Sequence, residues 1–250
     1  MDKRNSLLSI VAKVFVVCAF AIYVGTANAQ STKPEVRLAL DSLDGLEIKA
    51  APEKGGDEVK VKADITTYQG KRALHMLNDD TTMSAKTASG GESLAIVKGS
   101  DFRDGTIEVD LVGMPRQGAN SESRGFIGIA FHIQGDAEKF ENFYLRFTNG
   151  RSTDQLRRNH STQYTSFPDF PWFRLRQENP GVYESYVDIE EKAWTKVKIV
   201  VSGTKAQLYV NGADQPCLIV NDLKLGETHG PVALWTGSDT EAYFSNLRIK

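Results

Sequence analysis

The chain has 250 residues, a formal net charge of −2 at pH 7 and 40% hydrophobic residues, a composition typical of globular proteins. Its 30 basic residues do not outnumber its 32 acidic ones, so it lacks the basic surplus of nucleic-acid-binding proteins and we expect no nucleic-acid partner. Of the two cysteines, Cys18 lies in a segment that we expect to be removed, and Cys217 alone cannot form an internal disulfide.

Residues 1–29 have the pattern of a secretory signal peptide. Basic residues precede an apolar run at 14–25, and Ala27-Asn28-Ala29 is a small-x-small cleavage site before Gln30. The apolar run is too short to span a bilayer comfortably, and no later segment is apolar enough to do so. We therefore expect a secreted or periplasmic protein with no membrane span after signal removal.

The remaining chain has the size of one all-β domain, about 220 residues. Residues 30–44 resemble a polar leader, and the domain itself is predicted over 45–250. Without a disulfide, such a domain depends on a sizeable hydrophobic core, and this length can supply one.

Short runs that alternate with period two predict β-strands, and turn residues separate them. The runs cover 58–66, 106–113, 126–134, 142–147, 183–189, 194–202, 205–212, 231–237 and 242–249. Two of them form a predicted hairpin through Ser202-Gly203-Thr204, and Asn211-Gly212 predicts a turn after it. Many short strands without long helical periodicity predict an all-β sandwich or jelly roll.

The predicted strand at 105–113 carries Glu108 and Asp110 on one face. Retaining β-glucanases of the laminarinase type have a similar strand, in which a second Glu follows two or three residues after the Asp. Here that position holds Val112 or Gly113, so the pair of carboxyl groups about 5–5.5 Å apart that retention requires is broken. We expect a half-exposed strand with outward polar residues and no laminarinase-type catalysis.

Residues 148–182 form a long stretch without regular periodicity. Such stretches in compact domains are usually functional or disordered, and the aromatic content here argues against disorder. Residues 140–186 contain eleven aromatic residues, and residues 140–191 contain six arginines and no lysine. We predict an ordered excursion packed on one face of the sandwich.

The arginines of this region suggest recognition of defined geometry rather than bulk charge. They are Arg146, Arg151, Arg157, Arg158, Arg174 and Arg176. Guanidinium groups bind carboxylate or sulfate in a bidentate manner, which predicts an anionic or polyhydroxylated ligand. Eight acidic residues lie in the same window, so internal ion pairs that order the excursion are the alternative.

Two residues are candidates for acid/base chemistry. His160 lies among polar residues of the excursion, and Glu184 lies beside Tyr183 and Tyr186. Tyrosine rings cover the apolar faces of sugars, and carboxylates accept hydrogen bonds from their hydroxyls. The alternative for Glu184 is a solvated strand face.

No metal motif is present in the sequence. The four histidines, His75, His132, His160 and His229, lack ligand spacing with one another or with Cys217. Asp136, Asn149 or Asp154 could ligate calcium, but no EF-hand-like loop supports such a site, and no cofactor is predicted.

The strand set and the excursion together resemble secreted bacterial domains of the concanavalin A-like lectin/glucanase superfamily. The nearest resemblance is to laminin-G-like and 3-keto-disaccharide-hydrolase-like jelly rolls. It spans about 45–250 and rests on FRDGTIEVDLVGMP, RGFIGIAFHIQ, KAQLYVNG, AYFSNLRI and the excursion itself. The resemblance implies a two-sheet antiparallel jelly-roll sandwich whose concave face or adjoining loops bind glycans. These folds host lectins, hydrolases, lyases and adhesion modules, so function has to be argued from the site.

We predict that aromatic residues stack on sugar rings and that arginines hold hydroxyls or acidic groups. The predicted ligand-binding residues are Arg146, Asn149, Arg157, Arg158, Asn159, Tyr164, Trp172, Arg174, Tyr183 and Tyr186, and the catalytic candidates are Glu184 and His160. Three functions stay open: a domain that binds or processes a glycan or polysaccharide, a glycoside hydrolase or polysaccharide lyase that uses Glu184 or His160, and a non-catalytic adhesion or scaffolding module.

Overall fold

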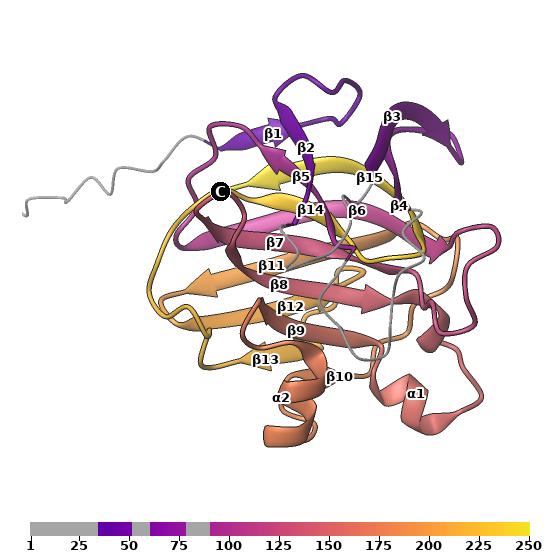
Figure 1. Ribbon diagram of the computed structural model, residues 1–250, viewed down its shortest axis with the longest axis vertical. Coiled ribbons are helices and arrows are strands. Elements are labelled where there is room, and N and C mark those ends of the chain that lie inside the picture. The colour runs from indigo at the N-terminus through magenta and orange to yellow at the C-terminus, as the bar shows by residue number, and fades with distance from the viewer. Residues whose placement is uncertain (1–34, 52–60, 79–90) are drawn as a thin grey trace, which may run out of the picture. The chain divides into compact units, whose positions relative to one another are not determined.

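The structure, a computed structural model, describes residues 35–51, 61–78 and 91–250 (Figure 1). The predicted signal peptide lies outside the described residues. Within these residues the chain forms fifteen strands in two antiparallel sheets, together with two short α-helices and one 3₁₀ turn. This confirms the predicted all-β, two-sheet antiparallel sandwich.

One sheet has eight strands. They are β1 (Val36–Leu38), β3 (Val61–Tyr68), β4 (Lys71–Asn78), β6 (Gly105–Pro115), β11 (Thr195–Ser202), β12 (Lys205–Val210), β13 (Leu218–Val220) and β15 (Thr240–Ile249). Their order is β13-β12-β11-β6-β15-β4-β3, and β1 pairs with the far end of β15. The long strands β6 and β15 therefore form the centre of this sheet.

The other sheet has seven strands. They are β2 (Leu46–Ala50), β5 (Ser93–Val97), β7 (Phe126–Gln134), β8 (Lys139–Arg146), β9 (Thr162–Phe167), β10 (Glu184–Ser185) and β14 (Ala233–Thr236). Their order is β10-β9-β8-β7-β14-β5-β2, and in Figure 1 they follow one another from β2 at the top to β9 and β10 near the bottom.

The core lies between the two sheets because alternate residues of each strand point inward. On β6, Ile107 and Val109 join the core cluster; on β8, Phe143 and Leu145 do so. Phe143 and Phe131 of β7 stack with ring centroids 6.2 Å apart. Each fully buried side chain of this size contributes about 1.5–3 kcal/mol, so this layer supplies the stability that the chain cannot take from disulfides.

The segment after β8 turns away from the sheet and forms two short helices. A 3₁₀ turn (η1, Phe147–Asn149) leads to α1 (Gln155–Asn159), and α2 (Trp172–Glu178) follows β9. The carboxylate of Asp154 caps α1 by accepting hydrogen bonds from the backbone N–H groups of Leu156 and Arg157, at 2.9 and 3.3 Å. Figure 1 shows both helices next to the β9–β10 edge. Within the described residues, no helix is long and apolar enough to cross a membrane.

The predicted excursion at 148–182 is not wholly outside the sheets. Its middle forms β9, which pairs with β8 over residues 162–167. The sequence TQYTSF hides this strand because buried polar residues occupy both faces: Thr162 and Ser166 share a face with Tyr164, and Gln163 is buried on the other face. A search for alternating hydrophobicity therefore misses it.

Two further boundaries differ from the sequence prediction. The predicted polar leader contains β1, which is too short to show periodicity but pairs with Leu247–Ile249. The predicted strand at 183–189 reduces to β10, because only Glu184 and Ser185 find partners on β9. By contrast, the predicted hairpin is confirmed: Ser202 pairs with Lys205, and Asn211 and Gly212 both adopt positive φ, 54° and 75°.

Candidate functional site

A cavity of about 390 Å³ lies on the outer face of the seven-stranded sheet, the face turned away from the core. We call it the sheet-face cavity. Its floor comes from β7, β8 and β14, and its walls come from the segment that carries α1 and α2. The chain reaches this geometry because β8 sends Tyr144 and Arg146 outward while Phe143 and Leu145 enter the core.

Aromatic side chains form the floor of the sheet-face cavity. Tyr144 on β8 stacks on Trp235 on β14, with ring centroids 4.9 Å apart and an interplanar angle of 30°. Phe126 on β7 meets Tyr144 edge-on at 6.2 Å. The indole N–H of Trp235 is buried and has no hydrogen-bond partner among the described residues.

Trp172 extends the aromatic surface onto α2. The guanidinium carbon of Arg176 lies 4.7 Å from its ring centroid, and that of Arg146 lies 5.9 Å from it. Cation–π contacts of this kind hold an indole ring in a fixed orientation. Trp172 is half-buried and lines the cavity, so part of its ring remains accessible.

Arg146 is the most buried cation of the cavity, with 5% of its surface exposed. It donates to the Tyr144 hydroxyl, to the Gln163 side-chain oxygen and to the His160 carbonyl, each at 3.0 Å. All three acceptors are neutral. Burial lowers the pKa of Arg146 from its ordinary value, because a guanidinium loses hydration there without a carboxylate in contact.

Arg157 projects from α1 into the same cavity. It donates to the Asn149 side-chain oxygen at 3.4 Å and to the Thr148 hydroxyl at 3.3 Å, which are also neutral acceptors. Asn149 in turn donates to the His160 carbonyl at 3.1 Å. Arg146 and Asn149 therefore hold the C-terminal end of α1 through one carbonyl group.

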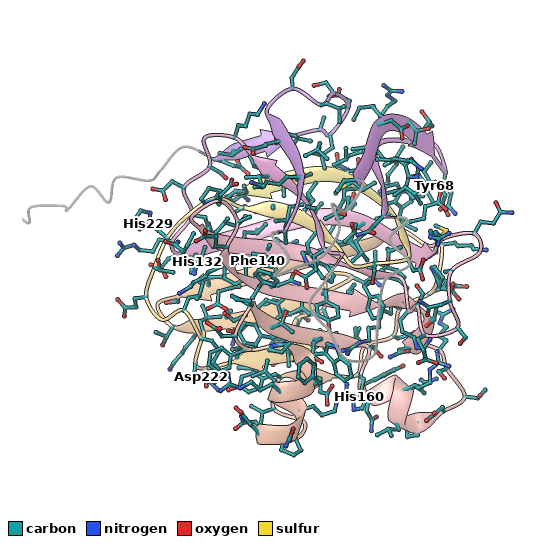
Figure 2. The ribbon with its side chains drawn as sticks, in the orientation of Figure 1. Tyr68, His132, Phe140, His160, Asp222 and His229 are labelled. Carbon is teal, nitrogen blue, oxygen red and sulfur yellow. The ribbon has the colours of Figure 1, made fainter. Side chains whose placement is uncertain are left out.

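His160 lies beside α1 (Figure 2). It contacts a charged pair, Glu184 and Arg176. Its Nε2 is 3.2 Å from Glu184 Oε1, and Arg176 grips the Glu184 carboxylate with Nε at 3.0 Å and Nη2 at 2.6 Å. Burial lowers the pKa of His160 from its ordinary value of 6.5, while the Glu184 charge opposes this shift. Folding therefore favours the neutral imidazole.

Glu184 itself does not line the sheet-face cavity. Its side chain is 4% exposed, and Arg176 and His160 occupy its oxygens. In the structure, Glu184 therefore orients His160 and Arg176 rather than facing a ligand.

Several predicted ligand-binding residues lie outside the cavity, on the surface. Arg158 donates to the Tyr186 hydroxyl at 2.8 Å and lies over its ring. Asn159 accepts a hydrogen bond from Gln155 within α1. Arg174 pairs with Glu178 one turn along α2.

Two predicted tyrosines are core residues. Tyr164 is fully buried between the sheets, where its hydroxyl donates to Glu141 at 2.6 Å and accepts from the Lys224 backbone N–H at 2.8 Å. Tyr183 is 3% exposed and donates to Asp222 at 2.6 Å. The structure thus places both rings where a ligand in the cavity does not reach them. Tyr164 lies on a position of β9 that faces the core, which the polar sequence of β9 concealed, and Tyr183 lies directly before β10.

The two sequence interpretations of the arginine cluster each describe part of it. Arg151 pairs with Asp188 at 2.9 Å and with Glu190 at 2.7 Å, as the internal ion-pair alternative predicts. Arg174 and Arg176 also have carboxylate partners. Within the part of the chain that the structure describes, Arg146 and Arg157 form no ion pair with a carboxylate.

The strand with Glu108 and Asp110 belongs to the other sheet. Both side chains alternate with core residues of β6 and so point out of the eight-stranded sheet, away from the sheet-face cavity. Asp110 is held by Lys71 at 3.0 Å and by Asn246 at 2.8 Å. These two bonds give the Asp110 carboxylate a structural role in the eight-stranded sheet.

No group of three His, Cys, Asp or Glu side chains in the described residues is arranged to hold a metal ion. The three calcium candidates have other partners: Asp136 pairs with Lys49, Asp154 caps α1, and Asn149 bonds the His160 carbonyl and Arg157.

Sequence reasoning missed the floor of the cavity. The sequence could have placed Tyr144 and Arg146 on one face of the sheet, because alternate residues of one strand share a face. It could not have placed Trp235 and Phe126 beside them, because their proximity depends on β14 and β7 being neighbours in the sheet. Arg124, which also lines the cavity, comes from the loop before β7 and carries no sequence signal.

No protein-family model matches the chain, and no curated protein matches it. Among solved structures, it is similar to a Bacillus subtilis protein with a galectin-like fold, with TM-score 0.53 and 10% identity, over 85% of this chain and 93% of that one. The carbohydrate-binding module CBM66 from Bacillus subtilis gives TM-score 0.49 and 14% identity, over 76% of this chain and 95% of that one. The β-glucanase of Bacillus licheniformis gives TM-score 0.48 and 13% identity, over 87% of this chain and 98% of that one. The two antiparallel sheets and the similarity to the galectin-like structure show that the chain has the concanavalin A-like jelly-roll fold.

Proposed function

We propose that this protein binds a carbohydrate in the sheet-face cavity. The observation that carries the proposal is the aromatic floor of Tyr144 and Trp235, with Trp172 beside it and an unpartnered buried indole N–H within it. Sugars combine apolar C–H faces with hydroxyl groups at their edges. A surface that pairs aromatic rings with fixed donors matches both features.

The cavity has dimensions suited to one or two sugar units. Its volume of about 390 Å³ falls in the range of small-molecule sites, about 300–1,000 Å³. Donors surround the floor: the Trp235 indole, the Arg146 and Arg157 guanidinium groups and the Asn149 amide all belong to lining residues. Most of these groups are buried or hydrogen-bonded to the framework, so binding costs little side-chain entropy.

The proposed site of action is outside the cytoplasm. The expected signal peptide at residues 1–29 would carry the protein to the periplasm or the medium, where polysaccharides are accessible. N-terminal sequencing of the exported protein should begin at Gln30. Recovery of the whole chain with Met1 in the cytoplasm would contradict this assignment.

The direct test of the proposed function is a glycan array probed with the purified protein, with and without calcium. We expect binding to a defined set of glycans, and product analysis of every hit separates a binding module from an enzyme. Silence across neutral, acidic and sulfated glycans would contradict the proposal and favour the adhesion or scaffolding alternative.

A second candidate function, a glycoside hydrolase or lyase, is favoured by the contact between His160 and Glu184. In this candidate, the Glu184 carboxylate 3.2 Å from Nε2 favours the tautomer protonated at Nε2, and Nδ1 of this cavity-lining histidine is then the proton acceptor. A carboxylate that orients a histidine in this way is a general feature of acid/base sites. Glu184 is then a positioning residue and His160 the base.

This second candidate makes a separable prediction. His160→Gln should abolish turnover and leave glycan binding within about threefold, under ~1 kcal/mol. Glu184→Gln should shift the pH dependence of turnover, because the neutral amide no longer fixes the imidazole tautomer. Turnover that survives His160→Gln, or hits that yield no product, would exclude catalysis by this residue.

A further inference from the structure

We propose that the carbohydrate of the sheet-face cavity carries an oxyanion, a carboxylate or a sulfate, and that Arg146 and Arg157 bind this group. The inference rests on the proposed function and names the chemical class of its ligand. It follows from the charges of the cavity and from the partners that each charge has.

Arg146 is a buried cation that forms no ion pair within the described residues, and the buried Glu184 carboxylate, which Arg176 holds, acts on it only through its charge. Its hydrogen bonds go to a phenol, an amide oxygen and a backbone carbonyl. A guanidinium has five N–H donors, and these three bonds leave two for a ligand. A buried charge is normally paired, because desolvation of an unpaired ion is costly. An anionic ligand supplies the missing partner.

Arg157 adds a second charge of the same kind. Its partners, Asn149 and Thr148, are neutral. Arg157 also acts on Arg124: the pKa of Arg124 is lowered first by burial and then by the Arg157 charge. The cavity end formed by α1 and the loop before β7 therefore carries positive potential, which an oxyanion relieves.

The neighbouring carboxylates are already engaged. Glu122 pairs with Arg124 at 2.9 Å, and Glu184 is gripped by Arg176 and contacts His160. Neither has an ion pair with Arg146 or Arg157. The positive charge of these two arginines is therefore not neutralised by the acids closest to them in the described structure.

The remaining acid of the cavity wall, Glu92, lies towards the opposite side. It precedes β5, which β14 and β7 separate from β8. The cavity thus has a basic end at Arg146 and an acidic group at the β5 side. This polarity orients a sugar with its oxyanion at the arginines.

The test compares ligands that differ only in charge. Isothermal titration of the full protein uses oligomers of galacturonate, glucuronate and mannuronate, each beside its methyl ester, and sulfated galactan beside its desulfated form. We expect one acidic form to bind at least about tenfold more tightly than its uncharged counterpart, ~1.4 kcal/mol. The uronate and sulfate arms identify which oxyanion the site prefers.

Matched variants locate the effect. Arg157→Met should reduce the preference for the acidic form to about threefold or less, ~0.7 kcal/mol. Arg158→Met is the control and should keep the preference, because Arg158 is the next residue of α1 and contacts Tyr186 outside the cavity. Arg146→Lys keeps the charge but loses the fork and should weaken acid binding. Denaturant unfolding of each variant checks that it is folded. The comparison of acidic and uncharged ligands uses the wild-type protein, so it tests the inference even where a variant does not fold.

Each of the other outcomes contradicts the inference, its assignment to Arg146 and Arg157, or the proposed function. Equal or tighter binding of esters or neutral sugars contradicts the inference and leaves the proposed function standing. Acid preference unchanged in both Arg157→Met and Arg146→Lys contradicts the assignment to these residues. Absence of binding to every sugar, charged or neutral, contradicts the inference and the proposed function together.

Discussion

Single side chains in this protein differ in function according to their partners rather than their residue type. Arg151 and Arg174 form exposed ion pairs with acids of their own region. Exposed pairs of this kind contribute little to stability and serve mainly to order the surface. Arg146 and Arg157 share the same sequence region but bond only neutral groups and line the sheet-face cavity. The partner set therefore separates structural arginines from ligand-binding ones.

Trp172→Ala is expected to remove glycan binding while the protein stays folded. Trp172 is half-buried on the cavity wall, so its loss should cost less than the 3–5 kcal/mol typical of a fully buried Trp. Titration and denaturant unfolding measure the two effects. Phe173→Ala is the control, because Phe173 is the adjacent α2 residue, 44% exposed and outside the cavity wall. Glycan binding retained by Trp172→Ala would place the ligand elsewhere.

The stability of the protein should fall in acid partly through His160. Because burial lowers its pKa below 6.5, folding favours the neutral imidazole. This contribution is complete above the unfolded value and is lost as the pH falls through the folded-state pKa. Unfolding by denaturant at pH 7.5 and pH 5 should show a smaller loss for His160→Gln than for wild type. His229→Gln, at an exposed site, should behave as wild type. Equal losses in all three proteins would contradict the lowered pKa.

At the scale of elements, the site depends on α1, which is short and held mainly by its ends. Its N-cap is Asp154, and its C-terminal carbonyl at His160 is bonded by Arg146 and Asn149. A helix of five residues has little intrinsic stability. The geometry of Arg157 and His160 at the cavity therefore depends on these caps.

Asp154→Ala should destabilise the protein by about 1 kcal/mol and weaken glycan binding, because the first turn of α1 loses its acceptor. Asp154→Asn is the matched variant, since its amide oxygen can cap the same N–H groups. Thermal unfolding and glycan titration of the two proteins test this. A loss as large in Asp154→Asn as in Asp154→Ala would show that the charge, not the cap, is required.

The sequence predicts elements well where one face is apolar and one is polar. β11 and β12 were found because Val197 and Ile199 alternate with lysines. β9 was missed because its buried positions include Thr, Gln and Ser, which hydrogen-bond within the sheet region. The same cause hid the buried role of Tyr164. The cavity floor depended on sheet order, which short-range periodicity does not contain.

At the scale of the whole molecule, a buried polar network ties the seven-stranded sheet to the loop after β13. Glu141 on β8 is fully buried, accepting from the Tyr164 hydroxyl at 2.6 Å and from the Leu225 backbone N–H at 2.8 Å. Burial raises the pKa of Glu141 above its ordinary 4.5, while these hydrogen bonds oppose the shift. A raised folded-state pKa contributes stability at low pH that is lost as the pH rises through it.

Tyr164→Phe should destabilise the protein by about 1–3 kcal/mol, because it removes a donor from a buried carboxylate and an acceptor from the Lys224 N–H. The loss should be greater at pH 7 than at pH 4.5, since the ionised carboxylate needs the donor more. Denaturant unfolding at both pH values measures it. Tyr186→Phe, which removes a surface hydroxyl, should cost little. A pH-independent loss would contradict a change in the ionisation of Glu141 between these two pH values.

The location of the glycan site is tested most directly by the three tryptophans of the chain. Trp172 and Trp235 line the sheet-face cavity, whereas Trp194 packs on Tyr68 and Lys71 of the eight-stranded sheet. The measurement is the fluorescence change when a glycan identified on the array is titrated into Trp172→Phe, Trp235→Phe and Trp194→Phe. We predict that the change shrinks in the first two variants and is unaltered in the third. A change that persists when Trp172 and Trp235 are both replaced, or that vanishes in Trp194→Phe, would contradict binding in the sheet-face cavity.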